Sequence, residues 1–420
     1  MNITLTVWES AAFKLFCILL FLLLISCKKQ SQLVETNTGI TFINLPYPAK
    51  AYCVKKVNNE YFIAGSIYNT SKKNLNDGLI LCLNENFKLK WYNNYGGLNN
   101  DWFKCIDVNE HGIVAAGGSF SYTKPGKDKP DLLEDGFVVF TDKSGNMKSQ
   151  QFIYPQNSVN GINADRFNDV LLNDTVAWLV GYTENILEPS FIYLGDTWFV
   201  NITNSGNVHK QFNTTTLNLQ NDEGKNMIKL TDNTSVVFSE SLPNNSYYLT
   251  FLNQNYNDTL LVQKRIDMNF TNKTIYHKMW KGFDNINVFT AFLNNSRFLY
   301  INYSFSFNGE LLKNDTINFS EEFVYVKDIV PVNDNIIFCG SAQNDYLLNS
   351  SKKPFIESKQ IDNYITNWSK LINFNGTGEL TNIIKNDKGF TCFGNSSLFN
   401  KDNIFIVRFS NTGEFINENK

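Results

Sequence analysis

Carboxylate side chains are the residues of this chain whose type and spacing suggest chemistry. Asp101 and Asp165 stand at the same interval before Gly117 and Gly181, two glycines that each close an apolar run. Carboxylates lie near the matching place later in the chain, at Asp222, Asp284, Glu322 and Glu379. If the fold gathers them at one opening, they would offer a hard cation such as Ca²⁺ several oxygen ligands, or form a negative funnel for a ligand. The alternative is that each carboxylate caps the turn leading into its strand.

Two carboxylates facing each other across such an opening would also suit glycoside hydrolysis. The sequence contains no GxSxG nucleophile elbow and no P-loop, and its three histidines, His111, His209 and His277, have no metal-binding spacing. An active site assembled from distant strands would leave no local motif. We therefore expect no cofactor, with Ca²⁺ at the carboxylates as the alternative, and a saccharide hydrolase stays open beside a binding protein.

The cysteines outside the N-terminal segment do not suggest a disulfide framework. They number five, at Cys53, Cys82, Cys105, Cys339 and Cys392, with wide spacing and no CxxC pair. Most of them lie in apolar runs, which favours buried thiols. Cys53 and Cys105 occupy equivalent positions before their repeat glycines, but inner strands of neighbouring sheets usually stand too far apart for a disulfide.

An internal repeat of about 55 residues must position these side chains. Five apolar runs end in a glycine, at Gly65, Gly117, Gly181, Gly340 and Gly394. The long interval between Gly181 and Gly340 leaves room for three units, and "SVVFSES" (235–241) and "RFLYINYS" (297–304) fit the same strand without its glycine. The chain therefore contains seven units.

Further strands recur in phase with these glycines. A second apolar run opens with an aspartate in "DGLILCL" (77–83), "DGFVVFT" (135–141), "DTWFVNI" (196–202) and "DNIFIVRF" (402–409). A hairpin turn such as "NTGEF" and a last strand follow it. Each unit thus predicts four short strands rich in Val, Ile, Phe and Tyr.

The repeat resembles the β-propeller repeats of bacterial secreted proteins and lipoproteins, over residues 50–235 and 323–418. The resemblance implies an all-β, seven-bladed β-propeller of four-stranded antiparallel blades. Such sheets cover one another only when they stack radially, and a closed ring leaves no exposed end. We expect a domain over residues 39–420, in which the N-terminal strand of "GITFINLPYP" (39–48) closes the last blade. Tandem β-sandwiches, or a ring of six or eight blades, are the alternatives.

The N-terminus indicates export and lipid anchoring. The apolar run Leu15–Ile25 would span roughly 16 Å as a helix, which is too short to cross a bilayer and typical of a signal peptide. "LISC" (24–27) resembles the lipobox of bacterial lipoproteins, which implies a signal peptide over residues 1–26, acylation of Cys27 and a flexible tether over residues 27–38. Two or more acyl chains anchor a protein stably in a membrane, whereas one does not.

The compartment follows from the same segment. Lys28 after the cysteine argues against inner-membrane retention, and "KKQSQ" lacks the acidic residues of surface-exported Bacteroidetes lipoproteins. We expect an outer-membrane lipoprotein on the periplasmic face, with the cell surface as the alternative. Asp-Thr-apolar triplets resemble the O-glycosylation acceptor of exported Bacteroidetes proteins at Thr175, Thr259 and Thr316, although such triplets also suit turns between strands.

Composition and charge limit the partners. The net charge near −3 with mixed signs gives no case for nucleic acid. An aromatic content of 15% with only 9 prolines indicates a packed, strand-rich protein. Most tryptophans fall in strands, and Trp102 beside Asp101 is the better candidate for stacking on a ligand. We expect a lipid-anchored binding or scaffold protein of the cell envelope that presents propeller loops to a protein or glycan partner. The alternative is an envelope hydrolase that acts on a saccharide through carboxylates at the channel mouth.

The lipobox makes a direct prediction. The mature protein should begin at Cys27 and carry a diacylglycerol thioether and an N-acyl chain, because the apolar run ends at this cysteine. Mass spectrometry of the N-terminal peptide checks this, and Cys27→Ser is the control that should abolish both processing and lipid. An unmodified Cys27 in the mature protein would contradict the assignment.

Overall fold

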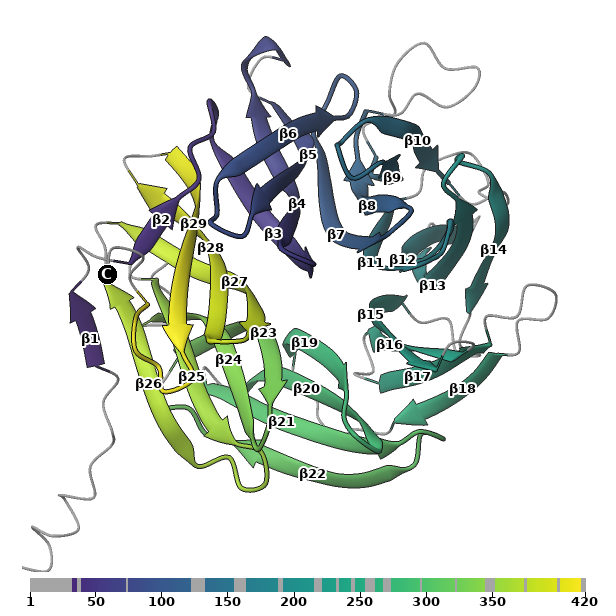
Figure 1. Cartoon of the computed structure of the whole chain (residues 1–420). Coiled ribbons are helices and arrows are strands. Elements are labelled where there is room, and N and C mark those ends of the chain that lie inside the picture. The colour runs from purple at the N-terminus through teal and green to yellow at the C-terminus, as the bar shows by residue number, and fades with distance from the viewer. Residues whose placement is uncertain are drawn as a thin grey trace, which may run out of the picture.

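The computed structural model of the chain is a ring of seven sheets around a central axis (Figure 1). It describes residues 32–35, 39–72, 75–121, 133–154, 164–187, 192–214, 221–231, 234–242, 246–253, 261–266, 273–294, 297–321, 323–343, 352–373, 376–398 and 401–416. The signal segment and Cys27 lie outside these residues. None of the helices in the described part is both long and apolar enough to span a membrane.

Each sheet, here called a blade, is antiparallel and has four strands that follow one another in the chain. Blade 1 contains β3 (Ala49–Val57), β4 (Glu60–Asn69), β5 (Leu75–Asn84) and β6 (Leu89–Tyr95), with the 3₁₀ turn η1 (Thr70–Lys72) between β4 and β5. Blade 2 contains β7 (Asp101–Asn109), β8 (Gly112–Ser119), β9 (Asp135–Thr141) and β10 (Met147–Ile153). Blade 3 contains β11 (Asp165–Asn173), β12 (Val176–Leu187), β13 (Ile192–Thr203) and β14 (Val208–Thr214).

The second half of the ring repeats this order. Blade 4 contains β15 (Asn221–Thr231), β16 (Thr234–Leu242), β17 (Ser246–Asn253) and β18 (Leu261–Ile266). Blade 5 contains β19 (Lys273–Lys281), β20 (Asn285–Asn294), β21 (Arg297–Ser306) and β22 (Leu311–Ile317). Blade 6 contains β23 (Phe323–Val332), β24 (Asn335–Gln343), β25 (Lys353–Gln360) and β26 (Thr366–Asn373), and β27 (Thr377–Asn386), β28 (Gly389–Leu398) and β29 (Lys401–Ser410) begin blade 7.

Two short N-terminal strands complete the ring. β2 (Ile40–Phe42) pairs antiparallel with β29 and supplies the fourth strand of blade 7, so that both ends of the propeller share one sheet (Figure 1). The Ile43 amide, directly after β2, donates to the carbonyl of Ile404 at 3.0 Å. Within the segment expected to be a tether, β1 (Gln32–Glu35) pairs in parallel with β26 and adds a fifth strand to blade 6.

The seven-bladed, four-stranded propeller is thus the fold of the chain, as the repeat predicts. One strand assignment in the degenerate part was wrong. Residues 235–241 lie in the second strand of blade 4, as expected, but residues 297–304 lie in β21, the third strand of blade 5. The second strand is β20, whose sequence "NINVFTAFLN" carries no glycine to mark it.

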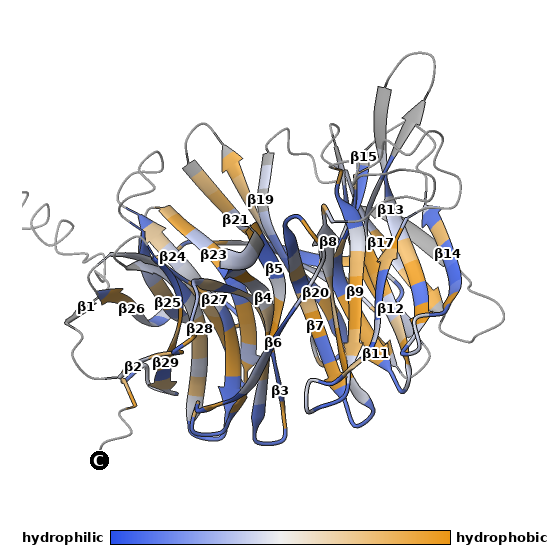
Figure 2. Ribbon diagram, turned by 90° about the horizontal axis from the view of Figure 1, so that it is seen from above, coloured by the Kyte–Doolittle hydropathy of each residue, from blue (hydrophilic) through white to orange (hydrophobic). Residues whose placement is uncertain are grey.

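Apolar contacts join the blades face to face. The buried apolar residues form seven clusters, and each cluster draws its members from two neighbouring blades, including blades 7 and 1. Viewed after a 90° turn, the apolar stretches run along the strands and hydrophilic residues occupy the turns below them (Figure 2). Since no blade covers both of its own faces, the core is the sum of the junctions.

The aspartate–glycine pairs that open the third strands of blades 1 and 2 also serve these junctions. A Cβ at Gly78 would lie 2.6 Å from the ring of Phe103, and one at Gly136 would lie 2.7 Å from the ring of Phe167. Each phenylalanine belongs to the innermost strand of the next blade. The glycine therefore leaves the space into which the next blade inserts an aromatic ring.

The repeat glycine has a different role, because it faces a β-bulge. In all seven blades the register between the first two strands shifts at the same point, and one residue of the inner strand is left unpaired. At Gly65, Gly117, Gly181, Gly340 and Gly394 an added Cβ would collide with a backbone carbonyl oxygen of this inner strand. Blade 4 relieves the crowding differently, since Gly224 stands in its inner strand and Ser239 faces it.

The close approach of the repeat glycine to the inner-strand carbonyl predicts that a methyl group added at this glycine lowers the stability of the protein. Gly181→Ala should destabilise the protein by about 3 kcal/mol or more, because the new Cβ meets the carbonyl oxygen of Arg166 and the backbone must shift. Chemical unfolding monitored by tryptophan fluorescence measures this. Ser239→Ala is the matched control at the equivalent position of blade 4. Its buried hydroxyl has no hydrogen-bond partner, so stability should change by less than about 1 kcal/mol. Equal losses in both variants would refute the bulge argument.

Candidate functional site

The innermost strands of the seven blades surround one cavity on the ring axis, with a volume of about 730 Å³. β3, β7, β11, β15, β19, β23 and β27 all contribute side chains to its wall, and Glu134 and Glu240 add to it from blades 2 and 4. These inner strands face the open centre of the ring in Figure 1. The wall is mainly polar and contains five lysine or arginine side chains and five carboxylates.

The β-bulge explains which residues reach the cavity. The residue that each register shift leaves unpaired is Tyr52, Lys104, Asn168, Lys225, Ile275, Lys327 or Thr381, in blade order. Those of blades 1 to 4, 6 and 7 line the cavity. Because the shift occurs at the same point in every blade, these residues form one layer around the axis. We call this set of seven the bulge layer.

Ion pairs bridge the junctions between blades within the described residues, and at the junction of blades 4 and 5 the bridge is a hydrogen-bonding histidine–carboxylate contact. The pairs, with their nitrogen–oxygen distances, are Lys55–Asp107 (3.5 Å), Arg166–Glu134 (3.4 Å), Arg166–Glu223 (3.1 Å), His277–Glu240 (3.2 Å), Lys278–Asp328 (2.7 Å), Lys327–Glu379 (3.5 Å) and Lys50–Asp402 (3.1 Å). Such pairs add little stability where water reaches them, but they fix the positions of side chains.

Aspartates of the inner strands strengthen three junctions in another way. Asp107, Asp169 and Asp328 accept hydrogen bonds from backbone amides of the next blade, namely those of Leu172 (2.8 Å), Met227 (2.8 Å) and Ile383 (3.0 Å). Burial raises the pKa of Asp169, even though the amides of Met227 and Val170 and the nearby Lys55 and Lys278 favour its charged form. These carboxylates hold the ring together and are already engaged.

Arg166 is the centre of a second group of charges. Its guanidinium lies between Glu134 and Glu223 and also over the ring of Tyr182, 4.8 Å from the ring centre. Burial opposes ionisation of Glu223, but Lys225 and Arg166 prevail and hold its pKa at about 2. Burial raises the pKa of Glu134, and Arg166 only partly offsets this effect. The pKa values of the two carboxyl groups that contact this guanidinium are therefore displaced in opposite directions.

The structure places the six predicted carboxylates in different surroundings. Asp101, Asp165 and Asp222 lie at the start of inner strands but are buried outside the cavity wall. Asp101 accepts hydrogen bonds from the Gly97 amide (2.8 Å) and the Ser121 hydroxyl (2.9 Å), and Asp165 accepts one from the Thr183 hydroxyl (2.6 Å). These hydrogen bonds hold strand starts and the turns before them.

The other three predicted carboxylates also differ from expectation. Asp284 is exposed in the turn after β19, at the opposite end of this strand from its start. The spacing misplaced it because blade 5 has no repeat glycine from which to count. Glu322 lies outside the described residues, and of the five predicted carboxylates that the structure describes, Glu379 alone lines the cavity. The expected ring of these carboxylates is therefore not the arrangement of the structure.

Sequence reasoning missed the bulge layer, although a spacing marks it. In five blades its member stands at one constant interval before the repeat glycine, and these members are Tyr52, Lys104, Asn168, Lys327 and Thr381. In blade 4 the interval from Lys225 to Ser239 is only slightly longer. The residue type varies from blade to blade, so a search for a repeated residue type passes over this position. Trp102, the predicted stacking residue, does line the cavity.

The remaining predicted residues lie as follows. The five cysteines are free thiols, and four of them are buried. Burial raises the pKa of the Cys105 thiol well above its usual range. Thr175 is exposed in the turn between β11 and β12, Thr316 is exposed on β22, and Thr259 lies outside the described residues.

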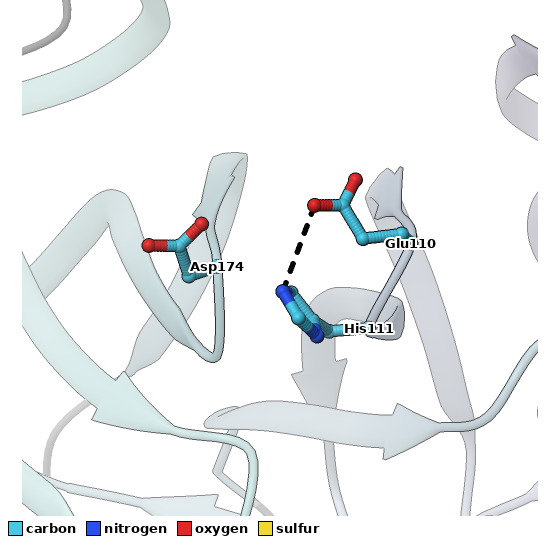
Figure 3. A group of neighbouring side chains, drawn as sticks. All are labelled: Glu110, His111 and Asp174. Atoms are coloured by element: carbon cyan, nitrogen blue, oxygen red, sulfur yellow. Dashed lines mark ion pairs between the residues drawn. The ribbon is translucent and has the colours of Figure 1, made fainter.

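One group of potential metal ligands lies away from the channel. Glu110, His111 and Asp174 come from two neighbouring turns and point toward one another (Figure 3). One ligand atom of each lies within 4.8 Å of the others, and Nε2 of His111 lies 3.6 Å from Glu110. All three side chains are exposed. Exposed acidic groups commonly gather without an ion, so this group does not identify a metal site.

Comparison with known proteins assigns no family to the chain. No protein-family model matches the sequence, and no curated protein matches it. Among solved structures, YCF48 bound to D1 peptide is 8% identical, with a TM-score of 0.48 over 90% of this chain and 99% of that one. A putative 6-phosphogluconolactonase from Bacteroides uniformis is 9% identical, with a TM-score of 0.48 over 86% and 96%. A Trypanosoma rangeli sialidase in complex with sialic acid is 8% identical, with a TM-score of 0.43 over 90% and 59%. None of these likenesses is close enough to carry an argument about the site.

The low pKa of Glu223 predicts how stability depends on pH. A carboxylate with a depressed pKa stabilises the fold above its unfolded value near 4.5, and this contribution is lost as the pH falls toward 2. Between pH 5 and pH 2, the wild type should therefore lose roughly 3 kcal/mol more stability than Glu223→Gln. Urea unfolding at stepped pH values measures the difference. Glu85→Gln makes the same change at an exposed turn and is the control. Parallel pH profiles for Glu223→Gln and wild type would contradict the role of Lys225 and Arg166.

Proposed function

We propose that this chain is a lipid-anchored binding protein of the bacterial cell envelope that holds the end of a glycan in its axial cavity. The observation that carries the proposal is the construction of the cavity: bulges repeated around the ring aim side chains at one axis, and ion pairs between blades fix the charged groups around them. A site whose polar groups are already in place costs little ordering when a ligand binds.

The size and chemistry of the cavity favour a glycan over a flat protein surface. Small-molecule sites usually enclose about 300–1,000 Å³, and the volume of about 730 Å³ falls within that range. Hydroxyl-rich ligands suit a wall with many hydrogen-bonding groups, such as Asn168, Asn226 and Thr274. The half-buried indole of Trp102 adds an apolar surface on which a sugar ring can stack.

The proposed location rests on the sequence. The lipobox cysteine Cys27 would be acylated and would hold the propeller at the outer membrane, on its periplasmic face or at the cell surface. The exposed hydroxyls of Thr175 and Thr316 are accessible to an O-glycosylating enzyme of a Bacteroidetes type. Nucleic acid is not among the proposed partners.

A hydrolase acting on a saccharide is the second candidate, and one observation favours it. Glu134 and Glu223 both line the cavity, and their pKa values are displaced in opposite directions by burial and by Arg166 and Lys225. One proton-donating and one ionised carboxyl group is the pairing that glycosidases use. Glu134 would be the acid and Glu223 the base or nucleophile.

Glycan-array binding tests the first candidate. Trp102→Ala should weaken binding to captured glycans by about 2 kcal/mol, or roughly 30-fold, because a buried stacking surface is lost. Trp91→Ala is the matched control, since Trp91 is half-buried on the outer strand β6, far from the channel wall. Equal binding by both variants would place the ligand elsewhere. Turnover of an array glycan that is lost in Glu223→Gln would establish the hydrolase instead.

A further inference from the structure

Three lysines of the bulge layer converge on the channel axis from alternate blades. Lys104 belongs to blade 2, Lys225 to blade 4 and Lys327 to blade 6, and each is the unpaired residue of its inner-strand bulge. The other four members of the layer, from the remaining blades, are Tyr52, Asn168, Ile275 and Thr381. This layer therefore contains three lysines and no carboxylate.

Carboxylates from other positions neutralise two of the three lysines. Nζ of Lys225 lies 2.6 Å from Glu223 and 3.6 Å from Glu240, and Nζ of Lys327 lies 3.5 Å from Glu379. Lys104, in contrast, makes no hydrogen bond and no ion pair within the part of the chain that the structure describes. Its side chain is exposed to the cavity.

The surroundings of Lys104 disfavour an uncompensated cation. Partial burial in the channel wall and the nearby charges of Lys327 and Lys225 together lower the pKa of its amine. The attraction of Glu223 does not cancel these effects. An anion placed beside Lys104 would supply the missing counter-charge, in a cavity that Lys225 and Lys327 also line.

We propose that Lys104, Lys225 and Lys327 form an anion site on the channel axis that binds the carboxylate or phosphate group of a small polar ligand. This inference rests on the proposed function, because it names the class of glycan or metabolite that the cavity takes: an acidic one. Lysine suits either group, since its ammonium acts as a compact charge with three donors and imposes no fixed fork geometry.

The site overlaps the charge pairs that support the ring only at Lys327, which pairs with Glu379 across the junction of blades 6 and 7. Arg166, Lys55 and Lys278 each contact a carboxylate of a neighbouring blade and are engaged in the junctions. Lys104 takes part in no ion pair across a junction of the described blades, so its charge is not needed to hold two blades together. A ligand-binding role accounts for a charge that the fold itself does not use.

Calorimetric titration of the mature, detergent-solubilised protein tests the proposal with four probes. Glucuronate and glucose 6-phosphate present the two anionic groups on a sugar, inorganic phosphate presents the anion alone, and glucose is the neutral counterpart. At least one anionic probe should bind, and glucose should bind at least tenfold more weakly than the sugar acid or sugar phosphate. The preference between glucuronate and glucose 6-phosphate identifies which group the site takes.

Variants locate the bound anion. Lys104→Met should weaken binding of the preferred probe by about 10- to 100-fold, because one charge-assisted contact is lost. Lys104→Arg keeps the charge and should stay within about threefold of wild type. Lys327→Met should also weaken binding, and Lys88→Met, at an exposed turn of blade 1, should not. Lys104→Met should melt at the wild-type temperature, since Lys104 has no partner to lose among the described residues.

Three results would overturn the proposal: no binding of any anionic probe, equal binding of glucose, or equal binding by Lys104→Met and Lys88→Met. The proposed function is tested separately by Trp102→Ala. If Trp102→Ala loses binding of a neutral glycan and Lys104→Met does not, the glycan site stands and the anion site falls. If neither variant changes any binding, both fall.

Discussion

The contact between the repeat glycine and the inner-strand bulge is the constraint on which the rest of the structure depends. A side chain at this glycine would occupy the space of a carbonyl oxygen in the bulged strand. The bulge in turn leaves one residue unpaired, and in at least six of the seven blades this residue lines the channel. A single local feature of the backbone, repeated around the ring, thus determines both the shape of the blades and the composition of the channel wall.

Contacts between neighbouring blades hold the ring together. Each blade contributes to two apolar clusters, one with each neighbour, and ion pairs, a histidine–carboxylate contact or aspartate–amide hydrogen bonds cross the inner edge of every junction in the described residues. β2 and β29 place both ends of the propeller in blade 7, which makes the last junction like the others. Among the described residues, the cluster between blades 3 and 4 is the smallest, with six buried members. Blade 4, on one side of this junction, has Ser239 in place of the repeat glycine.

The sequence predicts the architecture well because the glycine and the hairpin turns recur at nearly constant intervals. Steric crowding requires glycine at these points, and the backbone conformation of the turns restricts which residues occur there. Both positions can therefore be recognised in the sequence by residue type. Blade 5 shows the limit of this reasoning. Phe292 stands where five other blades have glycine. Without that marker the predicted second strand was assigned to β21, and Asp284 was placed at the wrong end of β19.

The channel wall could not be predicted in the same way. Its residues share a position relative to the bulge and no common chemistry, as Lys104, Asn168 and Thr381 illustrate. The carboxylates that do recur, Asp101 and Asp165, are repeated because they accept local hydrogen bonds at strand starts. Residues that recur in this chain are therefore the ones that each blade needs for its structure. The residues of the proposed ligand site, in contrast, differ from blade to blade.

This separation has an evolutionary consequence. The bulge residue of the inner strand is left unpaired with the neighbouring strand of its blade, and in six blades it lines the channel. Where such a residue makes no bond to the next blade in the described part of the chain, as at Lys104, it can be exchanged for another residue without repacking a junction. Each such position lies in a different blade, so a substitution at one of them leaves the others in place around the channel. Relatives with the same scaffold could acquire new ligand preferences through single substitutions, one blade at a time.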